Sequence, residues 1–152
     1  MKLQNKKFFI VGWIIVFLPF IISLTMPVYC ARPYEKSYDN QCGETWQGLF
    51  MFVLGWLGFM STTTWAAWFA NPLMFFAFGT SFIKPYMSLL LSGLALFLAL
   101  RFLDGGDFVL NEGGAKAYVS EYLNGYWYWL SSMVLSLILT ITYFVKKKAV
   151  KN

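Results

Sequence analysis

The sequence predicts an all-α membrane protein, a four-transmembrane-helix bundle in which the second segment is broken or re-entrant. Of its 152 residues, 59% are hydrophobic and only 12% are charged, whereas soluble domains carry about 25% charged residues. A soluble domain of this size could not bury so much apolar surface, because surface-to-volume scaling limits its core. Long uncharged stretches and a one-sided distribution of basic residues favour the same fold class, in a single domain over residues 1–152.

The uncharged stretches predict where the helices cross the membrane. About 20 helical residues span the hydrocarbon core, which is about 30 Å thick, and the first and last stretches have roughly this length. The third is shorter, but Lys84 and Arg101 at its ends can extend the apolar length by snorkelling. We expect crossings over 8–28, 85–103 and 122–145, a longer second segment over 46–83, and exterior loops over 29–45 and 104–121.

The second segment is too long for one crossing and too short for two crossings joined by a loop. Hydroxyl residues at 61–64 and the Asn71-Pro72 pair interrupt it near 60–71. Asn is suited to cap a helix, and Pro to lie in its first turn. Two interpretations stay open: a short re-entrant or interfacial helix from Trp46 to about Phe59 followed by a crossing from Trp65 to Phe82, or one crossing from Trp46 to Ala67 followed by a cytoplasmic-side helix from Asn71.

The basic residues predict the orientation of the helices. One side of the four-helix arrangement carries eight lysines and no acid, and the other side carries all seven acids with four basic residues. Basic loops stay in the cytoplasm, so we expect both termini to be cytoplasmic. The net charge of +5 then reflects topology, and we expect no nucleic-acid partner, because the charges are not clustered on one face. The lysines are Lys2, Lys6, Lys7, Lys84, Lys146, Lys147, Lys148 and Lys151.

A cleaved signal peptide is the rival interpretation of the N-terminus, because a basic start precedes an apolar run. The run is long for such a segment, and no small-x-small cleavage site follows it. Cys30 suggests lipoprotein processing, but Tyr29 stands where the processing enzyme needs a small residue. We therefore expect the segment to be retained as the first crossing.

Cys30 and Cys42 are the only cysteines, and both fall in the first exterior loop. An even pair on the non-cytoplasmic side predicts a disulfide. The closed loop would stabilise the fold by roughly 3 kcal/mol if the bond is unstrained. A redox role is less favoured, because it would call for a closely spaced pair such as C-x-x-C.

Small hydroxyl residues recur every four positions in two of the predicted helices. Ser132, Ser136 and Thr140 share one face of the last helix, and Ser88 and Ser92 share one face of the third. Small residues at this spacing let helices approach closely in lipid, so we expect the two stripes to face each other. A polar transport path is the alternative.

Four short motifs resemble a recurring pattern in a family of small, functionally uncharacterised four-helix bacterial inner-membrane proteins. They are GWLG at 55–58, WFANPL at 68–73, NEGG at 111–114 and GYWYWLSS at 125–132. The resemblance spans roughly residues 46–132 and implies a compact bundle in a bacterial plasma membrane. It carries no chemistry and implies no activity.

The sequence predicts neither an enzyme nor a cofactor or metal site. It contains no His, which is the usual neutral-pH acid–base group and the commonest metal ligand. No ionisable residue lies inside an apolar stretch to mark a proton or ion path. The acidic loop at 104–121 lacks the spacing of a calcium site, and we expect Asp104 to pair with Arg101.

Two function classes remain. The first is a non-catalytic protein that acts through protein–protein or protein–lipid contacts, as an accessory subunit or an immunity-type protein against a pore-forming toxin. The alternative is a small oligomeric transporter or a protein that binds a lipid or small molecule. Expected partners are membrane lipid and either another membrane protein or further copies of this chain. The candidate binding residues lie in the exterior half: Trp65, Trp68, Asn71, Asn111, Glu112, Asn124, Trp127 and Trp129.

Overall fold

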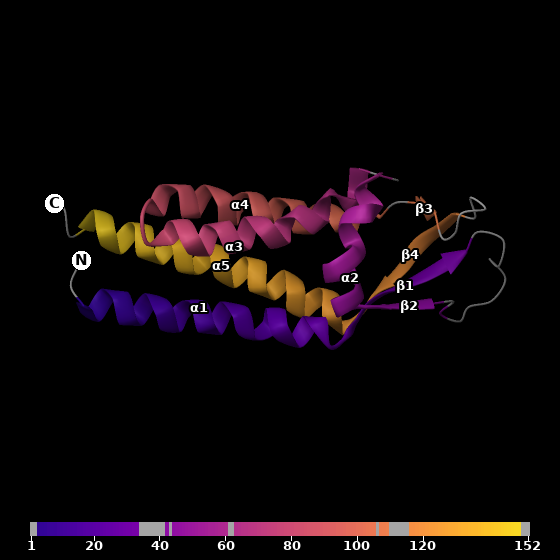
Figure 1. Ribbon diagram of the computed structural model, residues 1–152, viewed down its shortest axis with the longest axis horizontal. Helices are drawn as coiled ribbons and strands as arrows, with labels where there is room; N and C mark the ends of the chain where they lie inside the picture. The colour runs from indigo at the N-terminus through magenta and orange to yellow at the C-terminus, as the bar shows by residue number, and fades with distance from the viewer. Residues whose placement is uncertain are drawn as a thin grey trace.

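The computed structural model describes residues 3–33, 42, 44–60, 63–105, 107–109 and 116–149. Most of these residues are helical, and four helices run along the long axis of the molecule (Figure 1). The pairs α1–α5, α3–α4 and α4–α5 make the main contacts between them. These helices are α1 (Leu3–Leu24), α3 (Ala70–Ser81), α4 (Pro85–Arg101) and α5 (Asn124–Ala149).

Two described segments are long and apolar enough to cross a membrane, judged by length and composition: Pro85–Asp104 and Asn124–Lys147. Two further apolar helical stretches are shorter, over Phe9–Leu24 and Gly48–Leu57. The crossing expected over 8–28 corresponds to α1, which ends four residues earlier than expected. The crossings expected over 85–103 and 122–145 correspond to α4 with the short helix η4 (Phe102–Asp104), and to α5.

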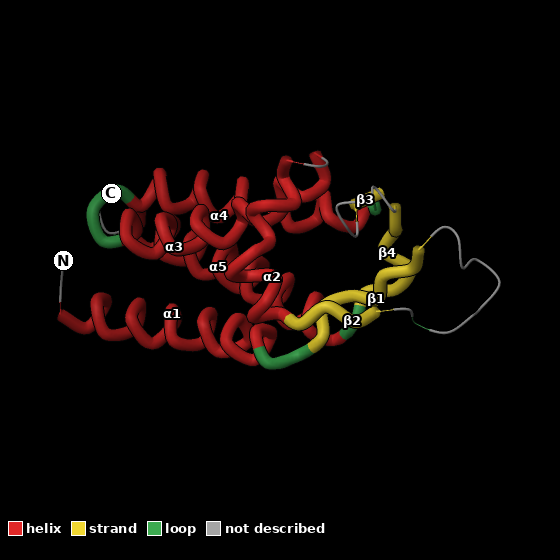
Figure 2. Tube along the Cα trace, turned by 45° about the vertical axis from the view of Figure 1, so that its right-hand side comes forward, coloured by secondary structure: helices red, strands yellow, loops and turns green. Residues whose placement is uncertain are grey.

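The connections divide between the two ends of the molecule. The start of α1, the turn at 82–84 between α3 and α4, and the end of α5 lie together at one end (Figure 1). The strands lie at the opposite end, beyond the helices (Figure 2). The turn that contains Lys84 therefore lies at the same end of the molecule as the start of α1 and the end of α5.

The mostly helical fold agrees with the prediction, but a four-stranded antiparallel sheet, in the order β2-β1-β4-β3, shows that the protein is not all-α. The central strands pair Tyr29 with Tyr122 and Arg32 with Tyr118, so the sheet joins the two segments that were expected to be exterior loops. In the paired strands, backbone N–H and C=O groups form hydrogen bonds with each other, whereas in loops they would bond to water. The strands are β1 (Pro27–Pro33), β2 (Glu44–Gln47), β3 (Asp107–Val109) and β4 (Lys116–Tyr122).

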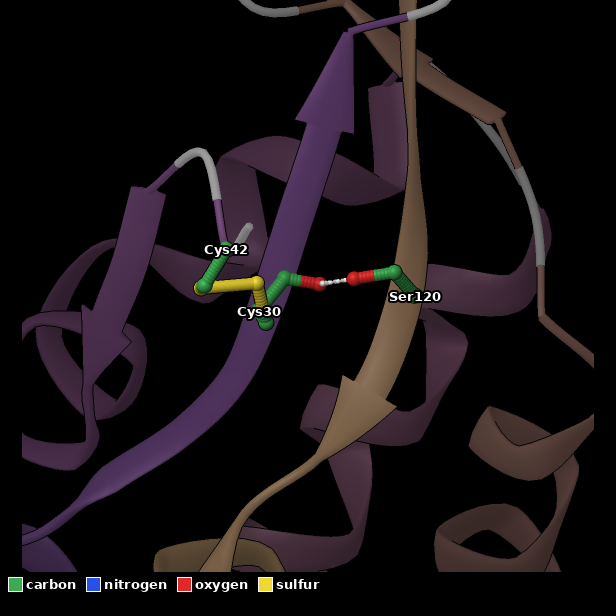
Figure 3. Close-up of a disulfide and its surroundings, with 3 residues drawn as sticks. All are labelled: Cys30, Cys42 and Ser120. Carbon is green, nitrogen blue, oxygen red and sulfur yellow. Dashed lines mark hydrogen bonds between the residues drawn. A yellow bond between two sulfur atoms is a disulfide. The ribbon is translucent and has the colours of Figure 1, made fainter. Parts of the chain in front are cut away.

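The disulfide prediction is confirmed. Cys30 in β1 is bonded to Cys42, which precedes β2, and their Cα atoms are 5.7 Å apart (Figure 3). On the other side of β1, the Ser120 hydroxyl donates to the Cys30 carbonyl oxygen at 3.2 Å. Cys30 thus connects β1 covalently to the β2 side and by a hydrogen bond to β4.

The two hydroxyl stripes face each other as expected. Ser92 of α4 and Ser136 of α5 share a buried hydrogen bond of 3.0 Å between their hydroxyl oxygens. Ser88 donates instead to the carbonyl oxygen of Ala77 in α3, at 2.8 Å. Small side chains at these positions let the helices approach closely enough for direct polar contact.

The second segment is broken near the expected position, between Met60 and Thr63, and again where η3 passes into α3. A short helix, α2 (Gly48–Leu54), continues as the 3₁₀ helix η2 (Gly55–Met60), and a second 3₁₀ helix, η3 (Thr63–Phe69), leads into α3. Asn71 does not cap α3, because the helix begins at Ala70 and its N-cap is Phe69, without a side-chain hydrogen bond. The Asn71 side chain has a partner elsewhere, in α5.

Gly48 and Gly79 form a matched pair for testing the close packing at the start of α2. A Cβ on Gly48 would overlap the carbonyl oxygen of Ser23, whereas a Cβ on Gly79 would meet nothing within 4 Å. Gly48→Ala should therefore lower the free energy of unfolding by about 1–3 kcal/mol. Gly79→Ala should be neutral or stabilise by up to about 1 kcal/mol. Unfolding in detergent, followed by circular dichroism, measures both; equal effects would contradict the close approach.

Removing the disulfide should destabilise the protein without unfolding it at ambient temperature. Cys42→Ser, or reduction of the wild type, should cost roughly 3 kcal/mol of unfolding free energy, because the unfolded chain regains loop entropy. The same unfolding assay, with and without reductant, measures this. Two thiols that alkylate freely in non-reduced protein would show that the bond does not form in the cell.

Candidate functional site

A partly open cavity of about 70 Å³ lies near the sheet end of the helices. The ends of α1 and η4, the short helix α2, the η3–α3 segment and the start of α5 all contribute to its wall. Among the described residues that line it, none is Lys, Arg, Asp or Glu. The lining consists of Phe20, Ser23, Leu24, Val28, Gly48, Met51, Phe52, Gly55, Ala67, Trp68, Asn71, Phe102, Tyr126 and Trp129.

The first fixed ring in the wall is the indole of Trp68. Its Nε1 donates to the carbonyl oxygen of Phe52 at 2.9 Å, which connects η3 to α2. A Cβ on Gly55 would lie only 2.7 Å from Trp68 Cδ1. The glycine therefore leaves the space that the indole occupies, and the GWLG motif has a packing role here.

The second fixed ring is the indole of Trp129, which is bonded to Asn71. Trp129 Nε1 donates to Asn71 Oδ1 at 2.8 Å, and Asn71 is only 5% exposed. An indole N–H can only donate, so this contact requires the carbonyl oxygen of the amide to face Trp129. The amide nitrogen, Asn71 Nδ2, donates no hydrogen bond to any residue that the structure describes. It is a donor at the cavity wall.

The hydroxyl groups of the wall have internal partners. The Tyr126 hydroxyl donates to the carbonyl oxygen of Ala99 at 3.0 Å, and the Ser23 hydroxyl donates to that of Phe20 at 2.6 Å. Behind the wall, the Tyr29 hydroxyl donates to the Met51 sulfur at 3.5 Å. Burial raises the pKa of the Tyr29 phenol, so it stays neutral at physiological pH. The cavity is thus apolar, with the Asn71 amide nitrogen as its distinctive polar group.

The structure brings together three of the predicted binding residues: Trp68, Asn71 and Trp129 all line the cavity. Trp127 does not, and it is 51% exposed on the outside of α5. Asn124, the first residue of α5, is also exposed. The backbone of Trp65 lies in η3, while Asn111 and Glu112 lie outside the described residues.

Sequence reasoning missed the apolar contributors to the wall. Phe20, Met51 and Phe52 come from α1 and α2, and Phe102 comes from η4. No signal distinguishes these positions among 16 Phe and 7 Met. Tyr126 could have been included, because it belongs to the GYWYWLSS motif that supplied Trp129.

No group of three or more His, Cys, Asp or Glu in the described part of the chain could hold a metal ion. The expected pairing of Asp104 is confirmed: its carboxylate lies 2.9 Å from the guanidinium of Arg101. Both side chains are well exposed, so this surface ion pair contributes little to stability.

A double-mutant cycle should show that Asn71 and Trp129 depend on each other. Asn71→Ala leaves the Trp129 indole N–H without its acceptor, and Trp129→Phe leaves the Asn71 oxygen without its donor. Each change should cost about 1–3 kcal/mol of unfolding free energy. The double variant should cost less than the sum by about 1 kcal/mol. Strictly additive costs, measured by unfolding in detergent, would contradict the bond.

Comparison with protein-family models, curated proteins and solved structures finds no match. The resemblance carried by the four motifs therefore stays a prediction. What the cavity does is inferred from its own geometry and from the surface around it.

Proposed function

We propose that this chain is a non-catalytic integral membrane protein that binds an apolar ligand in the cavity near its sheet. The location in a membrane is supported by a belt of exposed apolar side chains on the helices. In α1, Ile14 is 62% exposed and Leu18 is 60% exposed. The belt continues on the other helices through Phe76, Leu90, Phe97, Ile138 and Val145. Soluble proteins rarely expose contiguous apolar surface of this extent.

Helix lengths are compatible with four crossings. At 1.5 Å per residue, the apolar stretch Phe9–Leu24 of α1 extends about 24 Å, which is shorter than a hydrocarbon core of about 30 Å. A crossing by α1 therefore needs local thinning of the bilayer or snorkelling of the lysines before it. The 26 residues of α5 are long enough. Helix α3 has only 12 residues and gains length from η3 before it, while Lys84 can snorkel from the turn after it.

The charge distribution supports cytoplasmic termini. Lys84, Lys146 and Lys147 are exposed at the end of the molecule where α1 starts and α5 ends. The disulfide lies at the opposite end, which suits an oxidising compartment. The positive-inside rule then puts the sheet outside, and the motif resemblance favours a bacterial inner membrane.

The cavity favours ligand binding over a polar transport path. Ligand sites are concave and mostly apolar, with a few polar groups that fix orientation, and the cavity has this character. A polar transport path would have to be lined by the two hydroxyl stripes. In the structure, Ser92 and Ser136 of these stripes are hydrogen-bonded to each other, and α4 packs directly on α5.

Contact with another membrane protein is a second candidate function, of the accessory-subunit or immunity type. Trp127 and Tyr128 are exposed near the outer end of α5, and Tyr and Trp are favoured at the centres of protein interfaces. Trp127→Ala should weaken co-purification of such a partner and leave folding intact. Unchanged co-purification would assign these rings to the lipid headgroup level, where Tyr and Trp are also enriched.

Reporter fusions test the membrane part of the proposal. Fusions after residues 84 and 149 should report a cytoplasmic location, because lysine-rich segments stay on the cytoplasmic side. A fusion after residue 33 should report an exterior location. An exterior signal at residue 84 would contradict the four-crossing arrangement.

Filling the cavity tests the binding part. Ala67 lines the cavity, whereas its neighbour Ala66 does not, so Ala67→Phe and Ala66→Phe form a matched pair. Native mass spectrometry of protein extracted in mild detergent should show a bound adduct on the wild type. We expect Ala67→Phe to lose the adduct and Ala66→Phe to keep it. Met51→Phe, which fills the cavity from α2, should repeat the loss if Ala67→Phe folds poorly.

A further inference from the structure

Three phenylalanine rings stand between the cavity and the apolar surface of the helices. Phe20 of α1, Phe52 of α2 and Phe75 of α3 contact one another edge to face, with ring centroids 5.6 to 6.4 Å apart. Phe20 and Phe52 line the cavity, while Phe75 does not. Phe75 is 40% exposed, so the group reaches from the cavity to the outer surface. We call Phe20, Phe52 and Phe75 the phenylalanine wall.

The wall belongs to a seam where α1 and α3 meet through ring side chains. Phe17 stacks on Phe75 with centroids 5.7 Å apart and planes 18° apart, and it also contacts Phe78 edge to face. Side chains can change rotamer without moving the backbone. A seam closed by rings can therefore open from the side more readily than one closed by backbone contact.

The cavity lies close to the sheet-side ends of the helices, which is the level at which a membrane-spanning bundle would meet the ester groups of the lipids. Phe20 is four residues before the end of α1, and Trp129 is five residues after the start of α5. At 1.5 Å per residue, both lie roughly 6 to 8 Å inside the outer ends of these helices. The Asn71 amide nitrogen is at the same level, because its oxygen is bonded to Trp129.

We propose, building on the binding function above, that the ligand is one acyl chain of a bilayer lipid. The chain enters sideways through the phenylalanine wall, and an ester carbonyl oxygen accepts a hydrogen bond from Asn71 Nδ2. An uncharged acceptor suits a wall without charged residues, since a charge there would be desolvated without a partner. A volume of about 70 Å³ accommodates part of a chain. Water fits poorly, because it needs two to four polar partners.

Photo-crosslinking in vesicles tests this proposal. The protein is reconstituted in phosphatidylethanolamine and phosphatidylglycerol with a phosphatidylcholine probe that carries a diazirine near the ester of one chain. We expect crosslinks in the peptides that contain Phe20, Phe52 and Ala67 to Asn71. Ala67→Phe should abolish them, and Ala66→Phe should keep them. Labelling at the exposed residues Leu18 and Ile21, which lie at a similar depth on α1, should persist in all variants as the internal standard.

Two further variants test the donor and the route. Asn71→Leu keeps the approximate volume and removes both the Nδ2 donor and the acceptor of Trp129. With labelling normalised to folded protein, and with Trp129→Phe as the control that loses only the bond between the two side chains, cavity labelling in Asn71→Leu should fall by about tenfold at limiting probe concentration. Phe75→Ala opens the outer side of the wall and should speed cavity labelling, whereas its exposed neighbour variant Phe76→Ala should not. Equal rates for Phe75→Ala and Phe76→Ala would overturn the lateral route.

The two proposals fail in different ways. If the cavity peptides label no more in the wild type than in Ala67→Phe, no lipid chain enters, and the lipid proposal is overturned. The binding function survives that result if native mass spectrometry still shows an adduct that Ala67→Phe removes. Absence of both the labelling and the adduct would overturn both proposals.

Discussion

The pairing of β1 with β4 is the constraint on which the rest of the molecule depends. Strand β1 follows α1 after a two-residue turn, and β4 precedes α5 by a single residue. The Leu123 amide donates to the carbonyl oxygen of Val28 at 2.8 Å, and a Cβ on Gly125 would lie 2.6 Å from the carbonyl oxygen of Pro27. The pairing therefore holds the end of α1 against the start of α5. Those two helix ends form one side of the cavity.

The other side of the cavity depends on hydrogen bonds that reach between distant segments. The indole N–H of Trp68 reaches the backbone of α2, and the indole N–H of Trp129 reaches the side chain of Asn71. In a low-dielectric setting, polar groups without partners are costly, so such bonds fix the rings in place. Irregular backbone at membrane depth is tolerated when it lines a cavity or is buried in protein. Within the two 3₁₀ helices, Gly55 of η2 and both Ala67 and Trp68 of η3 line the cavity.

Sequence reasoning succeeded where the controlling interaction is local or compositional. Uncharged length indicated the long helices, the four-residue spacing of Ser and Thr indicated the contact between α4 and α5, and an isolated cysteine pair indicated the disulfide. It failed where the partner is distant in the chain and no repeat or composition marks it. Asn71 looked like a cap because its neighbour is Pro72, but its partner is Trp129, 58 residues away. The sheet was missed for the same reason, since Tyr29 pairs with Tyr122.

The chain order of the sheet has a consequence for how this protein is made. Strand β1 and its disulfide-linked neighbour β2 leave the ribosome early, whereas β4 follows only after α3 and α4. Strand β1 therefore has its β2 partner early, whereas its β4 partner is absent until most of the chain has been synthesised. The disulfide joins β1 to the residue just before β2, and pairing with β4 becomes available only when the last third of the chain has been made. A chain released before β4 would contain α1 to α4 but would lack Tyr126 and Trp129, the part of the cavity wall that α5 supplies.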